Sequence, residues 1–381
     1  MSFLHAIKLL NGQDNFPAGE LSGVLNSSAA ARQGCWSRLR ARRGWRSSLF
    51  LAVLGALALC VPASGEPADG TSHAGRFRQR DAVDKAIERG LAWLVKQQAQ
   101  DGEFPGKHQT TYTGLSCMAL MAAGHVPGRT EYGPQLARGI RYLVRATEKQ
   151  KGYLGADGGR MYGHGICTLA LAEAYGMMAE AAWNEKVGKA LERAIDTVLE
   201  AQNTASGEHE GGWRYERTSQ DADLSVSAWQ ILALRGAQNC GLDVPLKAVE
   251  RARTYVRRTY NSKTPGFTYQ RGRAASLPMR TAGVVCMHVL DSTNRPADEK
   301  KILASAAVMD GADVRSGKHY YYQSYYLGTA ALMSGDAAPD NTLTRLEGAL
   351  ISLQNEDGSF RKHSGYDGGV YATAFALVTL G

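Results

Sequence analysis

The chain has 381 residues, of which 44% are hydrophobic and 21% are charged, proportions typical of a globular protein. These values exclude a disordered, collagen-like or coiled-coil chain as the main content. The formal charge of +8 would suit a nucleic-acid partner, but residues 1–65 hold seven Lys/Arg against two Asp/Glu, which leaves 37 against 34 for the remainder. The nearly balanced remainder gives no support for nucleic-acid binding. Six cysteines without a Cys-x-x-Cys pair argue against a disulfide framework and a thiolate metal site.

The first 65 residues are typical of a leader that contains a signal peptide. A basic segment from Arg38 to Arg46 precedes an apolar run over 49–61, and small residues follow at 63–65. This is the order of a secretory signal. The run is too short to span a bilayer, which needs about 20 apolar residues. We therefore expect no membrane span and an exported protein, periplasmic or extracellular, whose mature chain begins near Glu66.

Two variants of the leader remain open. Cys60 could carry a lipid, although the bulky Leu59 before it is unusual for such sites. The pair Arg42-Arg43 could belong to a twin-arginine signal, which would export a folded protein. Residues 1–31 show no structural pattern, which leaves open a start downstream of Met1.

After a linker expected at 66–81, the chain alternates two kinds of predicted helix. Apolar residues recur at helical spacing from Val83 to Val95 with charged residues between them, which predicts a half-exposed helix. The segment 111–123 carries no charge, which predicts a buried helix. The same couplet recurs, with outer helices near 82–97, 134–149, 185–201, 246–260, 297–310 and 342–354 and inner helices near 111–123, 163–177, 224–238, 280–290, 323–333 and 370–380. A hairpin cannot bury its apolar face alone, so the six couplets must stack.

Each joint between an outer and an inner helix leads to an aromatic residue. These residues are Phe104, Tyr153, Trp213, Phe267, Tyr320 and Phe360. The joints from Gln97 to Phe104 and from Gln354 to Phe360 both contain Asp-Gly, and they resemble the QW-type repeat of the squalene–hopene cyclase and protein prenyltransferase superfamily. The joint from Gln202 to Trp213 is similar, with an insertion.

The resemblance implies an all-α fold, an (α/α)6 toroid of six helical hairpins over residues 82–381. Its inner helices would surround a central cavity. Periodicity alone would equally allow an open solenoid. For the joints we expect a structural role, in which Gln ends the outer helix, Asp-Gly turns the chain and the aromatic packs under the next helix.

In such a toroid the inner helices start at one rim, so residues near their N-termini would converge on the mouth of the cavity, where helix dipoles favour negative charge. The candidate cavity or ligand-binding residues are Tyr112, Tyr162, His164, Arg280, Tyr325 and Tyr371. His164 could act as an acid or base, but a hydrogen bond to a joint is the favoured interpretation. Tyrosines between 320 and 326 could stack on a sugar, a lipid or a cation, or simply fill space. Arg271, Arg273 and Arg280 form a basic patch that could receive an anionic group.

The candidate catalytic residues are Asp223 and Asp221. The segment from Asp221 to Leu224 resembles the Asp-x-Asp-Asp motif of squalene–hopene cyclases, in which the middle Asp protonates an alkene. The resemblance implies Asp223 as general acid and Asp221 in support, but Leu224 replaces the third carboxylate. So strong an acid needs paired carboxylates and hydrogen bonds in a dry pocket. The favoured alternative is that Asp223 caps the following helix, where Asp is a preferred residue.

No metal site or other cofactor is expected. The prenyltransferases of this superfamily bind zinc through an Asp-x-Cys pair and a later His. The four cysteines of the toroid region lack an Asp two residues before them: Cys117, Cys167, Cys240 and Cys286. Zinc prenyltransferase activity is therefore disfavoured, and these cysteines are interpreted as small buried hydrophobic residues.

Two functions stay open after the sequence. The first is a binding toroid for a protein partner, for an apolar or polyprenoid-like small molecule, or for a saccharide. The second is a cyclase- or lyase-type enzyme that uses Asp223 as general acid in the central cavity. The fold cannot decide between them, because one architecture hosts many functions.

Overall fold

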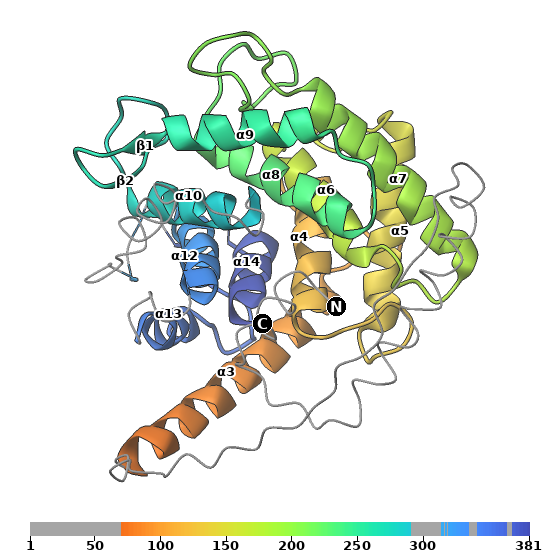
Figure 1. The fold of residues 1–381 in the computed structure, drawn as a ribbon. Coiled ribbons are helices and arrows are strands. Elements are labelled where there is room, and N and C mark those ends of the chain that lie inside the picture. The colour runs from red at the N-terminus through yellow and green to blue at the C-terminus, as the bar shows by residue number, and fades with distance from the viewer. Residues whose placement is uncertain (1–69, 291–313, 316, 318, 335–340, 364–367) are drawn as a thin grey trace, which may run out of the picture. The chain divides into compact units, whose positions relative to one another are not determined.

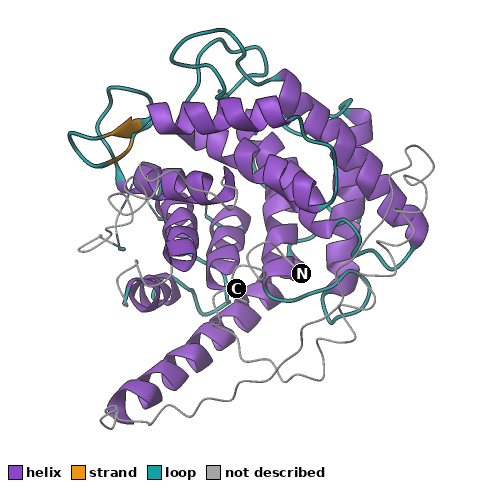
Figure 2. Ribbon diagram, in the orientation of Figure 1, coloured by secondary structure: helices purple, strands orange, loops and turns teal. Residues whose placement is uncertain are grey.

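The computed structural model describes residues 70–290, 314–315, 317, 319–334, 341–363 and 368–381. The leader and the outer helix expected near 297–310 lie outside these residues. The segment Asp81–Gly381 belongs to one compact unit. Within its described part, helices account for nearly all the regular structure, beside one antiparallel pair of two-residue strands (Figure 2). The all-α class expected from the sequence is confirmed.

Six inner helices alternate along the chain with outer helices. The inner helices are α4 (Gln109–Ala122), α6 (Arg160–Ala174), α8 (Leu224–Asn239), α10 (Leu277–Leu290), α12 (Tyr320–Ser334) and α14 (Val370–Leu380). They are apolar on all sides and buried over most of their length. The described outer helices are α3 (Gly70–Lys96), α5 (Gly133–Lys149), α7 (Ala181–Glu200), α9 (Leu246–Arg258) and α13 (Thr342–Ile351). From Asp81 onward each buries one side only.

Two features of the chain differ from the expected elements. Helix α3 begins at Gly70, so it covers most of the segment 66–81 that was expected to be a linker. No proline occurs between Gly70 and Asp81, and the Arg, Gln and Ala residues there favour a helix. The fourth joint contains the strands β1 (Tyr260–Asn261) and β2 (Gly266–Phe267), which form a short hairpin after α9.

The inner helices form a closed ring (Figure 1). Each packs against the next along the chain, and α14 packs against α4. On the outside, the last joint is tied to the first outer helix, because the side-chain amide of Gln354 donates to the carbonyl of Ala86 at 2.8 Å. The open solenoid is therefore excluded. Closure is favourable because a solenoid would leave the apolar faces of both terminal hairpins exposed to water.

A glutamine in the first joint links neighbouring repeats. The Gln98 amide donates to the carbonyl of Gly102 in its own joint at 3.0 Å and to that of Gln135 in α5 at 2.9 Å. Arg138 of α5 donates back to the Gln98 oxygen at 2.9 Å. The glutamine that links the repeats is therefore Gln98 and not Gln97, with which the sequence motif began. The Gln97 side chain donates instead to the carbonyl of Trp93 in the preceding helix.

The same arrangement recurs in the third and sixth joints. Gln202 donates to Gly211 and Ala248 and accepts from Arg251. Gln354 donates to Gly358 and Ala86 and accepts from Arg89. In each case the amide is saturated by its own joint and the next outer helix, so the glutamine fixes the position of one repeat against the next.

The glycine of the joint is required by its conformation and by its neighbour. Gly102 has a φ of +101°, and a Cβ there would lie 2.3 Å from the carbonyl oxygen of Arg138. Gly358 has a φ of +93° and faces Arg89 at the same distance. Only glycine accepts both the left-handed backbone and this close approach. The Asp-Gly signal in the sequence therefore marks a repeat contact as well as a turn.

The residue two positions after that glycine is buried and anchored to the inner helix. The N–H groups of Phe104, Trp213 and Phe360 each donate at 2.9 Å to the hydroxyl of Thr113, Ser227 and Thr373 respectively. In the second joint this place belongs to Leu154 and not to Tyr153. Leu154 is fully buried and its N–H donates to His164, whereas Tyr153 is half-buried. The structural role expected for the joints is confirmed.

Candidate functional site

Aromatic side chains meet across the axis of the ring. In the order of the ring, α8 lies opposite α14 and α6 opposite α12. Trp229 of α8 contacts Phe375 of α14 with ring centroids 6.2 Å apart, and Tyr162 of α6 contacts Tyr322 of α12 at 6.4 Å. Trp229 also stacks on Tyr325 at 5.1 Å. These rings therefore meet across the axis at their level, in the region where the resemblance implied a central cavity.

We call this cluster the aromatic column; its members are Trp229, Tyr322, Tyr325, Tyr326 and Phe375. Tyr325, expected to face the cavity, is buried inside it. The Trp229 N–H and the hydroxyls of Tyr322 and Tyr326 are buried, and no group in the described part of the chain accepts from or donates to them. The column is therefore held by the packing of its rings.

Other predicted cavity residues lie where the inner helices begin. Tyr112 and Tyr371 are in the first turns of α4 and α14, with ring centroids 5.8 Å apart, and Tyr371 contacts Phe375 of the column. Tyr162 is in the first turn of α6 and is half-buried. Arg280, in the first turn of α10, packs over Gly266 of β2. The convergence of helix starts on one rim thus brings Tyr112, Tyr162 and Tyr371 to the end of the aromatic column.

His164 lies in the first turns of α6, but its side chain bonds to the second joint and to α7. Its Nδ1 accepts from the Leu154 N–H at 3.1 Å, so Nε2 carries the proton and donates to the carbonyl of Ala194 at 3.0 Å. The imidazole is fully buried, and burial lowers its pKa to about 4. It occupies the place that Thr113 has in the first joint. Both ring nitrogens are used, which leaves none for acid–base chemistry.

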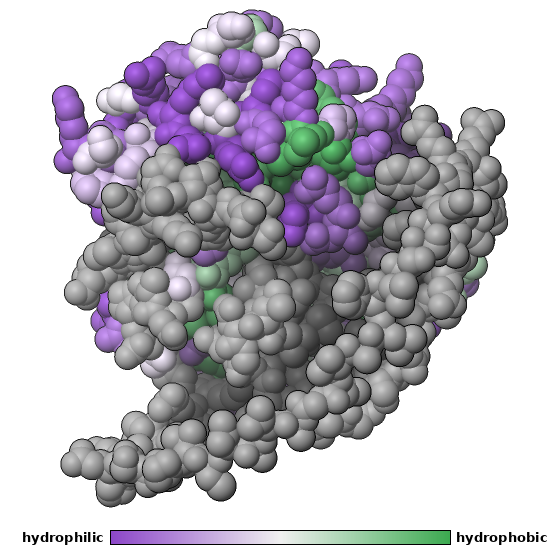
Figure 3. All heavy atoms as spheres, viewed as in Figure 1, coloured by the Kyte–Doolittle hydropathy of each residue, from purple (hydrophilic) through white to green (hydrophobic). Residues whose placement is uncertain are grey.

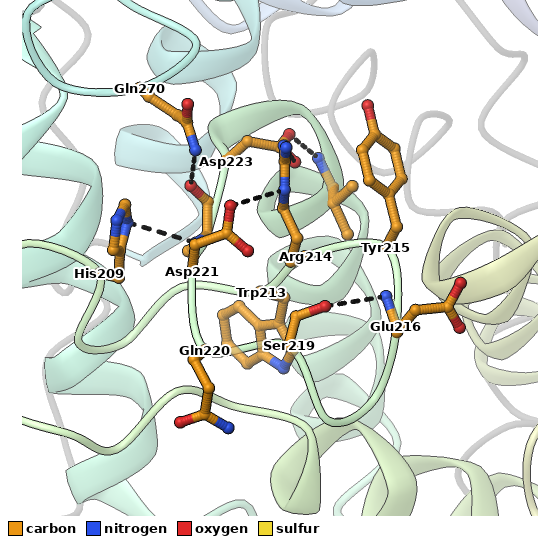
Figure 4. Close-up of polar contacts among 12 residues, drawn as sticks. His209, Trp213, Arg214, Tyr215, Glu216, Ser219, Gln220, Asp221, Asp223 and Gln270 are labelled. Carbon is orange, nitrogen blue, oxygen red and sulfur yellow. Dashed lines mark hydrogen bonds and ion pairs between the residues drawn. The ribbon is translucent and has the colours of Figure 1, made fainter.

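Asp223 caps the N-terminus of α8. Its Oδ1 accepts from the Val226 N–H at 2.9 Å and from the Ser225 hydroxyl at 2.6 Å. Its Oδ2 accepts from Arg214 at 2.7 Å (Figure 4). The side chain is fully buried. The expected capping role is confirmed. A buried carboxylate is stable here because three donors, one of them a guanidinium, compensate its desolvation.

Arg214 joins the two candidate acids. Its Nε lies 3.0 Å from Oδ2 of Asp221, while its Nη1 holds Asp223 (Figure 4). The same Nη1 also donates to the Tyr269 hydroxyl at 2.5 Å. The guanidinium lies over the ring of Tyr215 at 4.7 Å and that of Tyr269 at 5.5 Å. The two aspartates therefore do not touch each other directly but share one arginine.

Three tyrosines complete this cluster, which we call the rim site: Tyr162, Arg214, Tyr215, Asp221, Asp223 and Tyr269. The hydroxyls of Tyr215 and Tyr269 lie 2.9 Å apart, and that of Tyr162 is hydrogen-bonded to Ser225. Burial, reinforced by the charge of Asp223, raises the pKa of Tyr162 and Tyr269, so both phenols stay neutral. The site is open on one side, because 45% of the Asp221 side chain is exposed against none of Asp223.

Sequence reasoning missed Arg214, Tyr215 and Tyr269. A signal existed for the first two, since they directly follow the joint aromatic Trp213, and that position leads to the start of an inner helix. Tyr269 lies in the next joint, and only the fold brings it over α8. Its carbonyl accepts from the Leu224 N–H at 2.9 Å, and the Gln270 amide donates to Ala222 at 3.0 Å.

The four described cysteines lie apart from the rim site, within or next to the core of the toroid. Cys117, Cys167 and Cys286 are buried, and burial raises the pKa of Cys117 to about 12. Among the described residues, no group of three or more His, Cys, Asp or Glu side chains is placed to hold a metal ion. The helices of that same part include none with the length and apolar character needed to cross a bilayer.

The fold resembles those of solved enzymes of low sequence identity. An α-1,6-mannanase, GH76A of Salegentibacter sp. HEL1_6, in an inactive form with α-1,6-mannotriose, superposes with a TM-score of 0.55 at 10% identity over 79% of this chain and 97% of its own. The type II terpene cyclase MstE from Scytonema gives 0.53 at 12% identity in a complex with merosterolic acid A, over 80% of this chain and 97% of its own. With its substrate geranylgeranyl dihydroxybenzoate, a second variant gives 0.52 at 11% identity over 80% and 98%.

These likenesses concern the fold, since the identities are far too low to carry a function. No protein-family model matches the sequence, and no curated protein matches it. The likeness to a terpene cyclase nevertheless agrees with the resemblance found in the joints. The chain is an α/α toroid, a fold that it shares with these enzymes.

Proposed function

We propose that this toroid is a saccharide-binding protein and that its ligand lies on the rim site. The observation that carries the proposal is the composition of the open half of that site. There, the half-buried rings of Tyr215 and Tyr269 lie beside the ion pair of Arg214 and Asp221. Aromatic faces suit the apolar faces of sugar rings, while carboxylate, guanidinium and phenol groups supply the acceptors and donors that sugar hydroxyls require.

The aromatic column favours a rim ligand over one enclosed at the axis. A long polyprenoid would need the space where Trp229 meets Phe375 and Tyr162 meets Tyr322. Opening that space would separate rings that are buried against each other, at a cost in packing. A saccharide on the rim requires no such change. That a toroid can accommodate a saccharide is supported by the mannanase, whose complex contains mannotriose.

The surroundings of Asp223 support a structural role over acid catalysis. To protonate a ligand, this residue would have to carry a proton, and three donors already point at its two oxygens. A carboxylate accepts all three, whereas a protonated acid gives up an acceptor site. We infer that Asp223 caps α8 and fixes Arg214 in the rim site.

The binding proposal is tested with a panel of neutral and charged oligosaccharides, α-1,6-mannotriose included, measured by calorimetry. We expect at least one to bind, and Tyr215→Ala to weaken its binding by about tenfold or more. Tyr175→Ala is the matched control. It removes a partly exposed tyrosine at the C-terminal end of α6, away from the rim where the inner helices begin. Melting curves of both variants exclude loss of folding as the cause. Unchanged affinity of Tyr215→Ala, or no binding by any saccharide, would overturn the proposal.

A terpene cyclase-like activity is the second candidate, favoured by the burial of Asp223 within two hydrogen bonds of Tyr162. The test is turnover of squalene and geranylgeranyl substrates by the wild type and Asp223→Asn. Asparagine can still cap the helix, so this variant should unfold at a free energy within about 1–2 kcal/mol of wild type, with the lost Arg214 pair as the main cost. We expect no turnover from either protein. Turnover that disappears in the asparagine variant would replace our proposal.

Export is also proposed, on the basis of the basic segment, the apolar run and the small residues of the leader. The intact mass of the protein recovered from outside the cytoplasm measures the processing. We expect a mature chain that begins near Glu66 without lipid. A mass that corresponds to an acylated Cys60, or to an uncleaved leader, would contradict this expectation.

A further inference from the structure

Positive charge is concentrated in one repeat of the toroid. Residues 251–290 contain eight Lys/Arg and no Asp/Glu, whereas the rest of the chain after the leader contains 29 Lys/Arg against 34 Asp/Glu. This segment runs from α9 through the β1–β2 hairpin to α10 (Figure 1). The surface over α9 and the hairpin is predominantly hydrophilic (Figure 3). A toroid that is acidic elsewhere therefore carries one basic region.

Several of these cations are used within the fold, and others are not. Arg251 binds Gln202 of a joint, Arg253 binds the carbonyl of Leu290, and Arg258 pairs with Glu210. The cations of the two loops are different. Lys263, Arg271 and Arg273 are exposed, and in the described part of the chain none of them lies within ion-pair distance of an acidic group.

The loops that carry these cations are ordered by their own contacts. Asn261 Oδ1 accepts from the N–H of Lys263 at 2.9 Å, which fixes the tip of the hairpin. Thr268 and Ala275 form a bridge that closes the loop with Arg271 and Arg273. The two arginines therefore project from a closed loop, which lowers the entropy lost when they bind a ligand.

The second loop is attached to the rim site. Tyr269 is itself a member of that site, and its carbonyl accepts from the N–H of Leu224. The amide of Gln270 holds the carbonyl of Ala222, between the two aspartates. Arg271 is the next residue along the chain, and Arg273 follows a turn closed by its N–H to the Gln270 carbonyl at 3.1 Å. A chain-like ligand that leaves the rim site over this loop would pass both arginines.

We propose that the saccharide is an acidic one, with carboxylate or sulfate groups along its chain, and that Arg271 and Arg273 bind those groups while a sugar ring lies on the rim site. The inference rests on the proposed saccharide function and names its ligand class. Guanidinium groups match carboxylates and sulfates in charge, and their fork of N–H donors can bind two oxygens of either group at once. In this proposal, Tyr215 and Tyr269 contact the sugar ring, and Arg271 and Arg273 of the loop bind the acidic groups.

Other polyanions fit the surface less well. A membrane-binding loop would present apolar side chains to insert into the bilayer, and the large exposed hydrophobic residues of the described chain are Tyr175 and Leu246, both outside these loops. A nucleic acid would be tracked by a continuous basic groove. Here the cations lie beside a site that contains two carboxylates, one of them exposed.

The test compares one chain with and without charge. Hexagalacturonate and its fully methyl-esterified form differ only in their carboxylates, and a chondroitin sulfate hexasaccharide adds sulfate. We expect one or both acidic ligands to bind the wild-type protein at least about tenfold more tightly than the ester at low salt. This preference should shrink at 1 M salt, where charges are screened within about 3 Å. The double variant Arg271→Gln/Arg273→Gln should abolish it.

Lys85→Gln/Lys96→Gln is the matched control, since it removes two exposed positive charges from α3 and should leave the preference intact. If neutral saccharides bind through Tyr215 and charge makes no difference, the inference is wrong and the proposed function stands. If no saccharide binds, both are wrong. Tighter binding of phosphatidylglycerol vesicles or single-stranded DNA through the same two arginines would likewise overturn the inference in favour of that partner.

Discussion

The first and third joints share one architecture, and only the third carries a candidate site. In both, a glutamine amide links its own joint to the next outer helix, and a glycine with positive φ lies against that helix. The backbone N–H of the aromatic residue then donates to a side-chain hydroxyl of the inner helix. That hydroxyl lies nine residues after Phe104 in the first joint and fourteen after Trp213 in the third.

The extra residues of the third joint form most of the rim site. Arg214, Tyr215 and Asp221 lie between the anchored aromatic and the cap of α8. The contact between repeats is thus the same in both joints. The residues proposed to bind a ligand lie in the longer segment that follows the aromatic residue of the third joint. The predictions that follow test this division between a shared frame and an added site.

Removing the aromatic of either joint should have the largest effect on stability. Trp213→Ala and Phe104→Ala should each lower the free energy of unfolding by about 4 kcal/mol, because each empties a fully buried position. Chemical denaturation of the two variants measures this. If one variant lost less than about 1 kcal/mol of unfolding free energy and the other lost the full amount, the two joints would not be structurally equivalent.

The glycine of the first joint should tolerate a side chain poorly. Gly102→Ala should cost about 3 kcal/mol, since a left-handed residue costs about 1–2 kcal/mol and the new Cβ would also meet the Arg138 carbonyl. Gly124 is the control, with a φ of +82° and no atom within 4 Å of the added Cβ, so Gly124→Ala should show only the conformational part. Equal costs for the two variants would contradict the close repeat contact.

The second joint should lose stability at acidic pH, because its anchoring side chain is a histidine. His164 must be neutral to accept from Leu154, and its pKa of about 4 lies below the ordinary value of 6.5. The unfolded chain therefore binds the proton more readily, and stability is lost as the pH falls from 6.5 towards 4. At pH 5 the loss should be about 2 kcal/mol relative to pH 7.

Denaturation curves between pH 7 and 5 measure this loss. His164→Thr places in this joint the residue found at Thr113 in the first one. It should lower stability at pH 7, because the Ala194 carbonyl loses its donor. It should also flatten the pH dependence. An equally steep dependence in the threonine variant would assign the effect to other groups.

Local patterns were enough to predict much of this protein. The alternation of half-exposed and charge-free helices follows from periodicity, and the turn and burial at the joints follow from Asp-Gly and the aromatics. The capping role of Asp223 follows from its type and its place before a helix. These features depend on residues within about one or two turns of each other, which is why the sequence alone determined them.

Contacts between distant segments were decided only by the tertiary structure. Periodicity alone could not show that α14 meets α4, although the resemblance in the joints implied a closed ring. The sequence also could not show that Leu154 rather than Tyr153 is the anchored residue, or that Tyr269 from the next repeat completes the site around Arg214. The resemblance implied a central cavity, and only the structure shows that aromatic rings from opposite helices meet across the axis at one level. Side chains of the inner helices have the same apolar pattern whether a ligand or another side chain fills the axis. The distance between opposite helices therefore decides the outcome, and that distance is set by closure of the whole ring.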